Sequence, residues 1–160
     1  MTVLYITLIV FALAFSGVLL VGAPYLPTLR PQVAVAFELL ALKKGQTLLE
    51  LGCGDGKVLI AAAEQGYNAI GIELNPFLAL IAWLRTRRYK GKVRVIWGNF
   101  WQGSWPPADG VFVFLLDRFM PRLDERMKIY GGPVASVAFT VPGKTPSKQA
   151  SGVFLYRYSR

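Results

Sequence analysis

Residues 50–56 read ELGCGDG and combine three glycines with two carboxylates. Glycines at this density let a backbone turn tightly and let a ligand lie against main-chain atoms. The dinucleotide pattern G-x-G-x-x-G is not reproduced, because the third glycine comes one residue early and Lys57 stands in its place. A pyrophosphate would also lie near Glu50 and Asp55, and like charges repel at short range. The segment therefore predicts a cationic ligand.

The side chains that the sequence lacks restrict its chemistry. The chain has no histidine and one cysteine. The absence of histidine excludes a Ser-His-Asp triad, a Cys-His pair and most zinc sites. One cysteine excludes a disulfide framework and suits a reducing compartment. We therefore expect no metal, and any catalysis must depend on carboxylates, Tyr, Lys, backbone dipoles or a cofactor.

Helix-like and strand-like segments alternate along the chain after residue 30. The expected helices cover residues 31–42, 56–65, 75–89 and 121–130, and the expected strands cover 47–51, 69–74, 93–97, 111–116, 134–140 and 153–158. This alternation predicts an α/β fold with a mostly parallel sheet. No helix fits between the last two strands, so we expect the last strand to return antiparallel beside its predecessor. Ligands of such sheets bind beyond the carboxyl ends of the strands, where residues 50–56 follow the first strand.

The first 29 residues include no charged side chain, whereas all 18 Lys and Arg and all 9 Asp and Glu follow them. Residues 3–21 are almost entirely apolar and as a helix would span roughly 28 Å, which matches a bilayer core. We expect residues 1–23 to form one transmembrane helix and residues 24–160 to form the soluble domain. A cleaved signal peptide is the competing interpretation, although no basic n-region precedes the apolar run. Basic residues follow the run, so we expect a single-pass protein with its domain on the cytoplasmic side.

The chain has a net charge of +9, and six of the ten residues 85–94 are basic. These charges raise the question of which molecule the domain contacts. An anionic membrane surface, nucleic acid and plain solubility are all consistent with such a segment. The expected membrane helix favours the membrane surface, and we do not expect nucleic acid as a partner.

The pattern E-x-G-x-G-x-G at residues 50–56, with Glu73 ending the second expected strand in GIELNP, resembles the cofactor signature of class I S-adenosylmethionine-dependent methyltransferases. That cofactor carries two cations, a sulfonium and an ammonium, together with a ribose diol. The resemblance implies a compact Rossmann-like fold, S-adenosyl-L-methionine as methyl donor and S-adenosyl-L-homocysteine as product.

The resemblance also implies roles for individual residues. Glu73 would hold the ribose hydroxyls with Leu74 beside it, and Glu50 and the glycine turn would face the methionine half. The turn residues assigned to the cofactor are Gly52, Gly54, Asp55 and Gly56. Asn99 stands where many members place an Asp near the adenine amino group. Phe100 and Trp101 would flank the ring, and filling of the core is their alternative role.

A narrower resemblance rests on PYLPT at residues 24–28, AIGIELNPFLALIAWLR and a late AFTVP. These segments are similar to the membrane-anchored protein lysine methyltransferases that modify the ATP synthase c subunit and the adenine nucleotide translocase. The similarity implies that Tyr25 and Thr28 close over the cofactor; otherwise Tyr25 is an interfacial aromatic. It implies a protein substrate with an accessible lysine, at or near a membrane. A methyltransferase of a small molecule, lipid or nucleic acid, or a non-catalytic dinucleotide-binding membrane module, stays open.

Asp117 is the only acidic side chain at the end of the fourth expected strand. A carboxylate there could orient the attacking amine, which makes Asp117 the candidate catalytic residue. Capping of the helix that begins near Pro121 is its alternative role.

Overall fold

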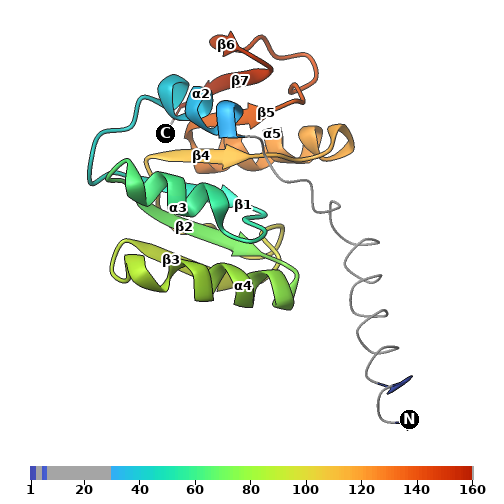
Figure 1. Cartoon of the computed structure of the whole chain (residues 1–160). Helices are drawn as coiled ribbons and strands as arrows, with labels where there is room; N and C mark the ends of the chain where they lie inside the picture. Colours follow the sequence, from blue (N-terminus) through green and yellow to red (C-terminus); the bar gives the residue numbers. More distant parts are fainter. Residues whose placement is uncertain (3–4, 7–29, 160) are drawn as a thin grey trace.

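The structure, a computed structural model, describes residues 1–2, 5–6 and 30–159 (Figure 1). Most of the expected membrane helix and the expected domain boundary lie outside the described residues, as do Tyr25 and Thr28. Within the described part of the chain, no helix is both long and apolar enough to cross a membrane.

Seven strands form one sheet in the order β3-β2-β1-β4-β5-β7-β6. The strands are β1 (Thr47–Leu51), β2 (Asn68–Glu73), β3 (Val93–Trp97), β4 (Gly110–Val113), β5 (Gly132–Val137), β6 (Lys148–Ala150) and β7 (Val153–Tyr158). The pairs among β1 to β5 are all parallel, and β7 runs antiparallel between β5 and β6. The predicted antiparallel return of the last strand is confirmed, whereas β6 was not predicted.

Helices cover both faces of this sheet. They are α2 (Arg30–Leu40), α3 (Lys57–Glu64), α4 (Pro76–Thr86) and α5 (Met120–Tyr130), with short 3-10 helices η1 (Arg87–Tyr89) and η2 (Asp117–Phe119). On one face α2, α3 and α4 pack against the sheet; on the other lies α5 (Figure 1). Asn75 caps α4 as predicted, because its side-chain oxygen accepts the N–H groups of Phe77 and Leu78.

The two central strands are buried almost throughout. Every residue of β4 is buried, as are the last four residues of β1. Glu50 of β1 lies opposite Gly71 of β2 on one side and Phe112 of β4 on the other. The carboxyl end of β1 therefore lies in the middle of the sheet, flanked by the ends of β2 and β4.

Residues 98–109 join β3 to β4 without a helix, as predicted. Buried Trp105 anchors this linker: its indole N–H donates to the carbonyl of Phe100 at 2.6 Å. Its ring packs edge-on against Tyr130 of α5 at a centroid distance of 5.3 Å, and the Tyr130 hydroxyl donates to the carbonyl of Pro106 at 2.7 Å. The linker thus packs beside α5 on the second face of the sheet.

Two strands end earlier than predicted. β4 ends at Val113, which pairs with Leu51 of β1 and Ser136 of β5. The residues after Val113 have no partner in either strand. β5 ends at Val137 because Ala138 adopts a left-handed φ of 69° and donates its N–H to Gly152. Neither continuation has a ladder partner, although both are apolar enough to resemble a strand.

Candidate cofactor site

Three left-handed glycines shape the turn that follows β1. Gly52, Gly54 and Gly56 have φ values of 80°, 53° and 80°, a region that L side chains rarely adopt. The N–H groups of Gly52 and Cys53 both donate to the carbonyl of Ile72, at 2.8 and 3.1 Å. The turn is therefore fixed to the end of the neighbouring strand β2.

This turn lies directly over Gly71 of β2. A Cβ at position 71 would be 2.6 Å from the Cys53 sulfur and 2.6 Å from a methyl carbon of Leu59. Only glycine allows this approach without displacing the buried Cys53 and Leu59 side chains. Gly71 was not predicted as part of the site, although an isolated glycine within a strand is the signal for such a contact.

We expect Gly71→Ala to lower the free energy of unfolding by about 1–3 kcal/mol, the usual effect of overpacking a core. Denaturant unfolding followed by circular dichroism measures it. Gly98→Ala is the matched control, because position 98 has an ordinary φ and nothing within 4 Å of an added Cβ. Equal unfolding midpoints for the two variants would contradict the close approach.

Glu73 connects the glycine turn to the start of α4. Its carboxylate is 7% exposed and accepts the N–H of Gly54 on one oxygen and the N–H of Asn75 on the other, both at 2.8 Å. Each carboxylate oxygen has lone pairs for a further donor. The predicted ribose-binding residue therefore lies against the predicted glycine turn.

Glu50 is the buried carboxylate at the carboxyl end of β1. It is 5% exposed, and its Oε2 has no hydrogen-bond partner among the residues that the structure describes. Burial, with the nearby charges of Glu73 and Asp55, raises the pKa of Glu50 well above its ordinary value. A cationic group would supply the missing partner and favour the ionised form. The donor set therefore fits a cofactor that carries an ammonium or sulfonium.

Asp55 differs from Glu50 because its charge is already balanced. Its carboxylate pairs with Arg85 of α4 and lies 3.6 Å from Lys57, and the Arg85 guanidinium also donates to the Asp55 carbonyl at 3.2 Å. This pairing ties the turn to α4 across 30 residues of sequence. A direct contact of Asp55 with the cofactor stays a prediction.

Phe100 is an aromatic residue that lies beside the turn. An added Cβ on Gly52 would lie 3.9 Å from the Phe100 ring, so the ring and the turn are in ordinary van der Waals reach. Phe100 also packs against Trp101, with a centroid distance of 4.7 Å. Both rings are half-buried, and both contact the core of the second sheet face. The predicted flanking role and the core-filling role are thus compatible for Phe100.

Leu74 and Asn99 lie at the same edge of the sheet, just after β2 and β3. The Leu74 carbonyl accepts the indole N–H of Trp97 at 3.1 Å. The Asn99 side-chain oxygen accepts the N–H of Trp101 at 2.9 Å. That bond orients the Asn99 amide, and its oxygen keeps a lone pair for another donor.

Asp117 lies beyond the end of β4, which is the neighbour of β1. It is exposed and occupies the first position of η2, before α5. The capping interpretation is wrong, because neither η2 nor α5 has a side-chain cap bond and Phe119 holds the cap position of α5. The Asp117 carboxylate has no hydrogen bond or ion pair with the described residues.

The sheet order, the glycine turn after β1 and the buried acidic residue ending β2 together define a class I S-adenosylmethionine-dependent methyltransferase fold. The sequence profile of the ANTKMT methyltransferase domain matches residues 50–148, which include the turn, Glu73, Asn99 and Asp117. The chain belongs to this family.

Relatives support the same assignment. The mouse protein named as the lysine N-methyltransferase of the ATP synthase c subunit is 30% identical over 128 residues, which are 77% of this chain and 51% of that protein. A protein-lysine N-methyltransferase of Saccharolobus islandicus is 29% identical over 134 residues, 78% of this chain and 82% of that protein. The chain thus spans about half the length of the mouse relative.

Among solved structures, an RNA methyltransferase of Salinibacter ruber in complex with S-adenosyl-L-homocysteine superimposes with a TM-score of 0.76. The two sequences are 27% identical, and the match covers 83% of this chain and 92% of that one. The ammonium group of such a ligand is the kind of partner that the Glu50 carboxylate lacks among the described residues of this chain.

Proposed function

We propose that this chain is an S-adenosylmethionine-dependent methyltransferase that modifies a lysine amine of a membrane or membrane-proximal protein. One observation carries the cofactor assignment: Glu50 is buried beside the glycine turn with one carboxylate oxygen unpartnered among the described residues, which suits a cationic ligand. The names of the mouse and Saccharolobus islandicus relatives support lysine as the acceptor.

The turn after β1 and the end of β2 form the binding residues in this proposal. Glu50 faces the ammonium end, Glu73 accepts the ribose hydroxyls, and Asn99 and Phe100 lie toward the base. Leu74 and the turn residues Gly52, Gly54, Asp55 and Gly56 complete the set. Bound S-adenosylmethionine supplies an activated methyl group, so the protein has mainly to align the acceptor and exclude water.

Asp117 and its aromatic neighbours prepare the acceptor amine. Lysine attacks only as the neutral amine, and its pKa is ordinarily about 10.4. Trp101 packs between Phe100 and Phe119, at centroid distances of 4.7 and 6.0 Å, and Phe119 belongs to the same 3-10 helix as Asp117. An amine held against these rings is partly desolvated, which lowers its pKa. The exposed Asp117 carboxylate orients the amine and accepts its proton directly or through water.

The membrane part of the proposal rests on sequence alone. Residues 1–23 act as a single-pass anchor, and residues 24–160 form the methyltransferase domain on the cytoplasmic side. Tyr25 and Thr28, in the connecting segment, contribute to the cofactor site. The proposal involves no metal. A tether of this kind raises the effective concentration of the enzyme at a membrane-embedded substrate.

Methylation of nucleic acid is the second candidate function. The Salinibacter ruber neighbour is described as an RNA methyltransferase, and residues 85–94 are strongly basic. We favour lysine because the curated relatives that cover most of this chain are named as lysine methyltransferases.

Thermal unfolding with added ligands tests the cofactor. We expect S-adenosyl-L-homocysteine to raise the Tm and NAD to leave it unchanged, because a ligand stabilises only the state that it binds. The reverse pattern would overturn the methyltransferase proposal. Transfer of a labelled methyl group into a membrane fraction then identifies the acceptor: label removed by protease supports lysine methylation, and label removed by nuclease supports the second candidate.

A further inference from the structure

The outward face of α4 is apolar along most of its length. Every exposed residue of α4 before Arg85 is apolar, while Ala79 and Ala82 face the sheet. The exposed apolar residues are Pro76, Phe77, Leu80, Ile81, Trp83 and Leu84. Eleven residues give α4 a length of about 16 Å. A helix on the surface of a soluble domain normally turns charged and polar side chains outward, so this surface is unusual.

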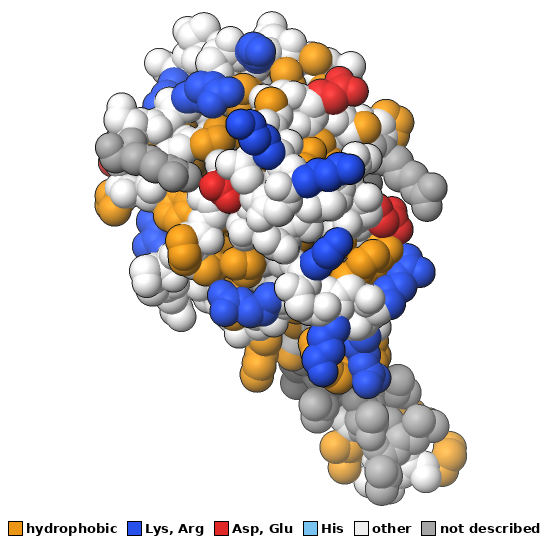
Figure 2. Space-filling model, turned by 90° about the vertical axis from the view of Figure 1, so that its left-hand side faces the viewer, with side chains coloured by type: hydrophobic (Ala, Val, Ile, Leu, Met, Phe, Trp, Pro, Cys, Tyr) orange, Lys and Arg blue, Asp and Glu red, His pale blue; other side chains and the backbone are white. Residues whose placement is uncertain are grey.

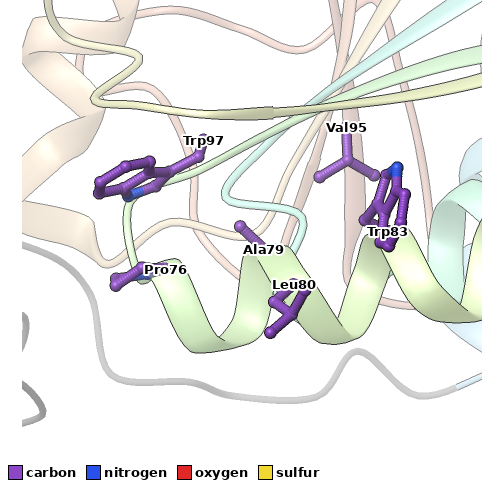
Figure 3. A pocket seen from close by; sticks show the side chains of 6 residues that line it. All are labelled: Pro76, Ala79, Leu80, Trp83, Val95 and Trp97. Atoms are coloured by element: carbon purple, nitrogen blue, oxygen red, sulfur yellow. The ribbon is translucent and has the colours of Figure 1, made fainter.

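Two tryptophans extend this surface toward the edge of the sheet. Trp83 of α4 is 50% exposed, and Trp97 at the end of the edge strand β3 is 69% exposed. They flank a shallow groove of about 260 Å³ whose other lining residues are Pro76, Ala79, Leu80 and Val95. Figure 3 shows the Trp97 indole near Pro76 at one end of the groove and the Trp83 indole near Val95 at the other. We call the exposed α4 side chains together with Trp97 the α4 face.

Unpaired cations adjoin the α4 face at the carboxyl end of the helix. Arg85 pairs with Asp55 and Arg88 lies 3.6 Å from Glu64, but three further exposed cations of this segment have no acidic partner within the described part of the chain. They are Arg87, Lys90 and Lys92. The Arg87 guanidinium stacks 5.0 Å from the centre of the Trp83 ring, which joins the cationic and apolar parts. In Figure 2, Lys and Arg side chains lie beside apolar ones at the bottom of the folded domain, at the height where Figure 1 places α4 and β3.

We propose that the α4 face docks onto a lipid bilayer with anionic headgroups. Large apolar and aromatic side chains with adjoining cations are the combination that binds the interfacial region of such a bilayer. Tryptophan is favoured at that depth because its ring is apolar and its N–H is polar. A symmetric dimer through the same face would bring two unpaired cationic segments into one interface, whereas anionic headgroups neutralise them.

The length of the connecting chain agrees with this placement. Residues 22–29 separate the apolar run from α2, and eight residues reach at most about 28 Å when fully extended. If residues 3–21 form the proposed anchor, the domain stays within about its own diameter of the bilayer. This step rests on the proposed function, while the exposed surface and its charges do not.

Site-directed fluorescence in the full chain tests the docking. An environment-sensitive probe is attached at Leu84→Cys on α4 or at Ile129→Cys on α5. Helix α5 covers the opposite face of the sheet, so position 129 is the control site. The native side chains are 49% exposed at Leu84 and 87% exposed at Ile129. The native Cys53 is buried, so the unsubstituted chain gives the labelling background. The protein is reconstituted into vesicles of phosphatidylcholine, with or without phosphatidylglycerol, that contain nitroxide-labelled lipids.

We expect the probe at position 84 to lose most of its emission in the anionic vesicles and much less in phosphatidylcholine alone, and the probe at 129 to lose little in either. Added salt weakens the quenching at 84, because it screens exposed charges. The charge-reversed variant removes it, with the substitutions Arg87→Glu, Lys90→Glu and Lys92→Glu.

Equal quenching at positions 84 and 129, or no dependence on lipid charge, would overturn the proposal. A blue shift at 84 that grows with protein density and is insensitive to nitroxide lipids would also overturn it, because that result indicates a second copy on the α4 face. Stabilisation by S-adenosyl-L-homocysteine in the same preparations separates failure of docking from failure of the proposed function.

Discussion

Glu50→Gln is expected to weaken binding of S-adenosyl-L-homocysteine by about tenfold or more, equivalent to about 1.4 kcal/mol, while the unliganded variant becomes more stable than the parent near neutral pH. The two effects have one cause. The buried Glu50 carboxylate has an oxygen without a partner among the described residues until a cation arrives, so its charge destabilises the free protein and stabilises the complex. Calorimetric titration measures the affinity, and denaturant unfolding measures the stability.

The pH dependence of stability and of affinity shows whether the effects of Glu50→Gln come from the lost charge or from the changed shape of the side chain. Burial and the neighbouring Glu73 and Asp55 raise the folded-state pKa of Glu50 above its ordinary 4.5. Between the ordinary and the raised pKa, the folded protein holds a proton that the unfolded chain has released. The stability of the free protein therefore falls as pH rises through this window, while its affinity for a cationic ligand rises.

Gln at position 50 should remove the part of both pH dependences that Glu50 contributes. Glu125→Gln is the matched control, because that carboxylate lies on α5 with its side chain 71% exposed, and it should leave both unchanged. Identical pH profiles for the parent and Glu50→Gln would contradict the assigned role.

Glu73→Ala is expected to abolish measurable cofactor binding and to lower the free energy of unfolding. The carboxylate accepts the buried N–H groups of Gly54 and Asn75, and each buried donor left unpaired costs about 1–3 kcal/mol. In the proposed site, the loss of affinity follows from the missing ribose acceptor and from the loosened turn. Glu73→Gln keeps one acceptor oxygen and should be intermediate in both properties.

Ligand titration below the thermal transition of Glu73→Ala keeps the two effects apart. Glu64→Ala is the control, because Glu64 forms exposed contacts with Arg88 and Tyr89, and such surface pairs contribute little. A folded Glu73→Ala protein with the affinity of the parent would show that Glu73 does not hold the ribose.

Most helices and strands of this fold could be predicted from periodicity and turn residues. Residues 93–97 and 153–158 form strands with the predicted bounds, because each apolar segment begins directly after a turn that contains a glycine, Gly91 or Gly152. β6 was missed since its three residues, Lys148–Ala150, are all exposed and carry no apolar pattern. It forms only because β7 offers an open edge to pair with.

The parts of the candidate site that depend on local backbone chemistry could be predicted. The parts in which side chains from distant segments contact each other could not. The glycine turn and the acid ending β2 have local signatures. The Asp55–Arg85 pair joins residues 30 positions apart and depends on how α4 lies against the turn. The sequence does indicate an apolar outward face on α4, since residues 76–84 are apolar on all sides of a helix. The exposure of that face could not be predicted, because it depends on β3 being an edge strand.

The linker of residues 98–109 has a consequence for how the protein tolerates change. A helix satisfies its own backbone groups, whereas this linker relies on individual partners such as the Trp105 indole and the Tyr130 hydroxyl. The same segment carries Asn99 and Phe100 of the candidate site. Trp105 and Tyr130 are not assigned to the site, but substitutions at either residue should alter ligand recognition and folding together. In this part of the molecule, mutation therefore cannot change one of these two properties without the other.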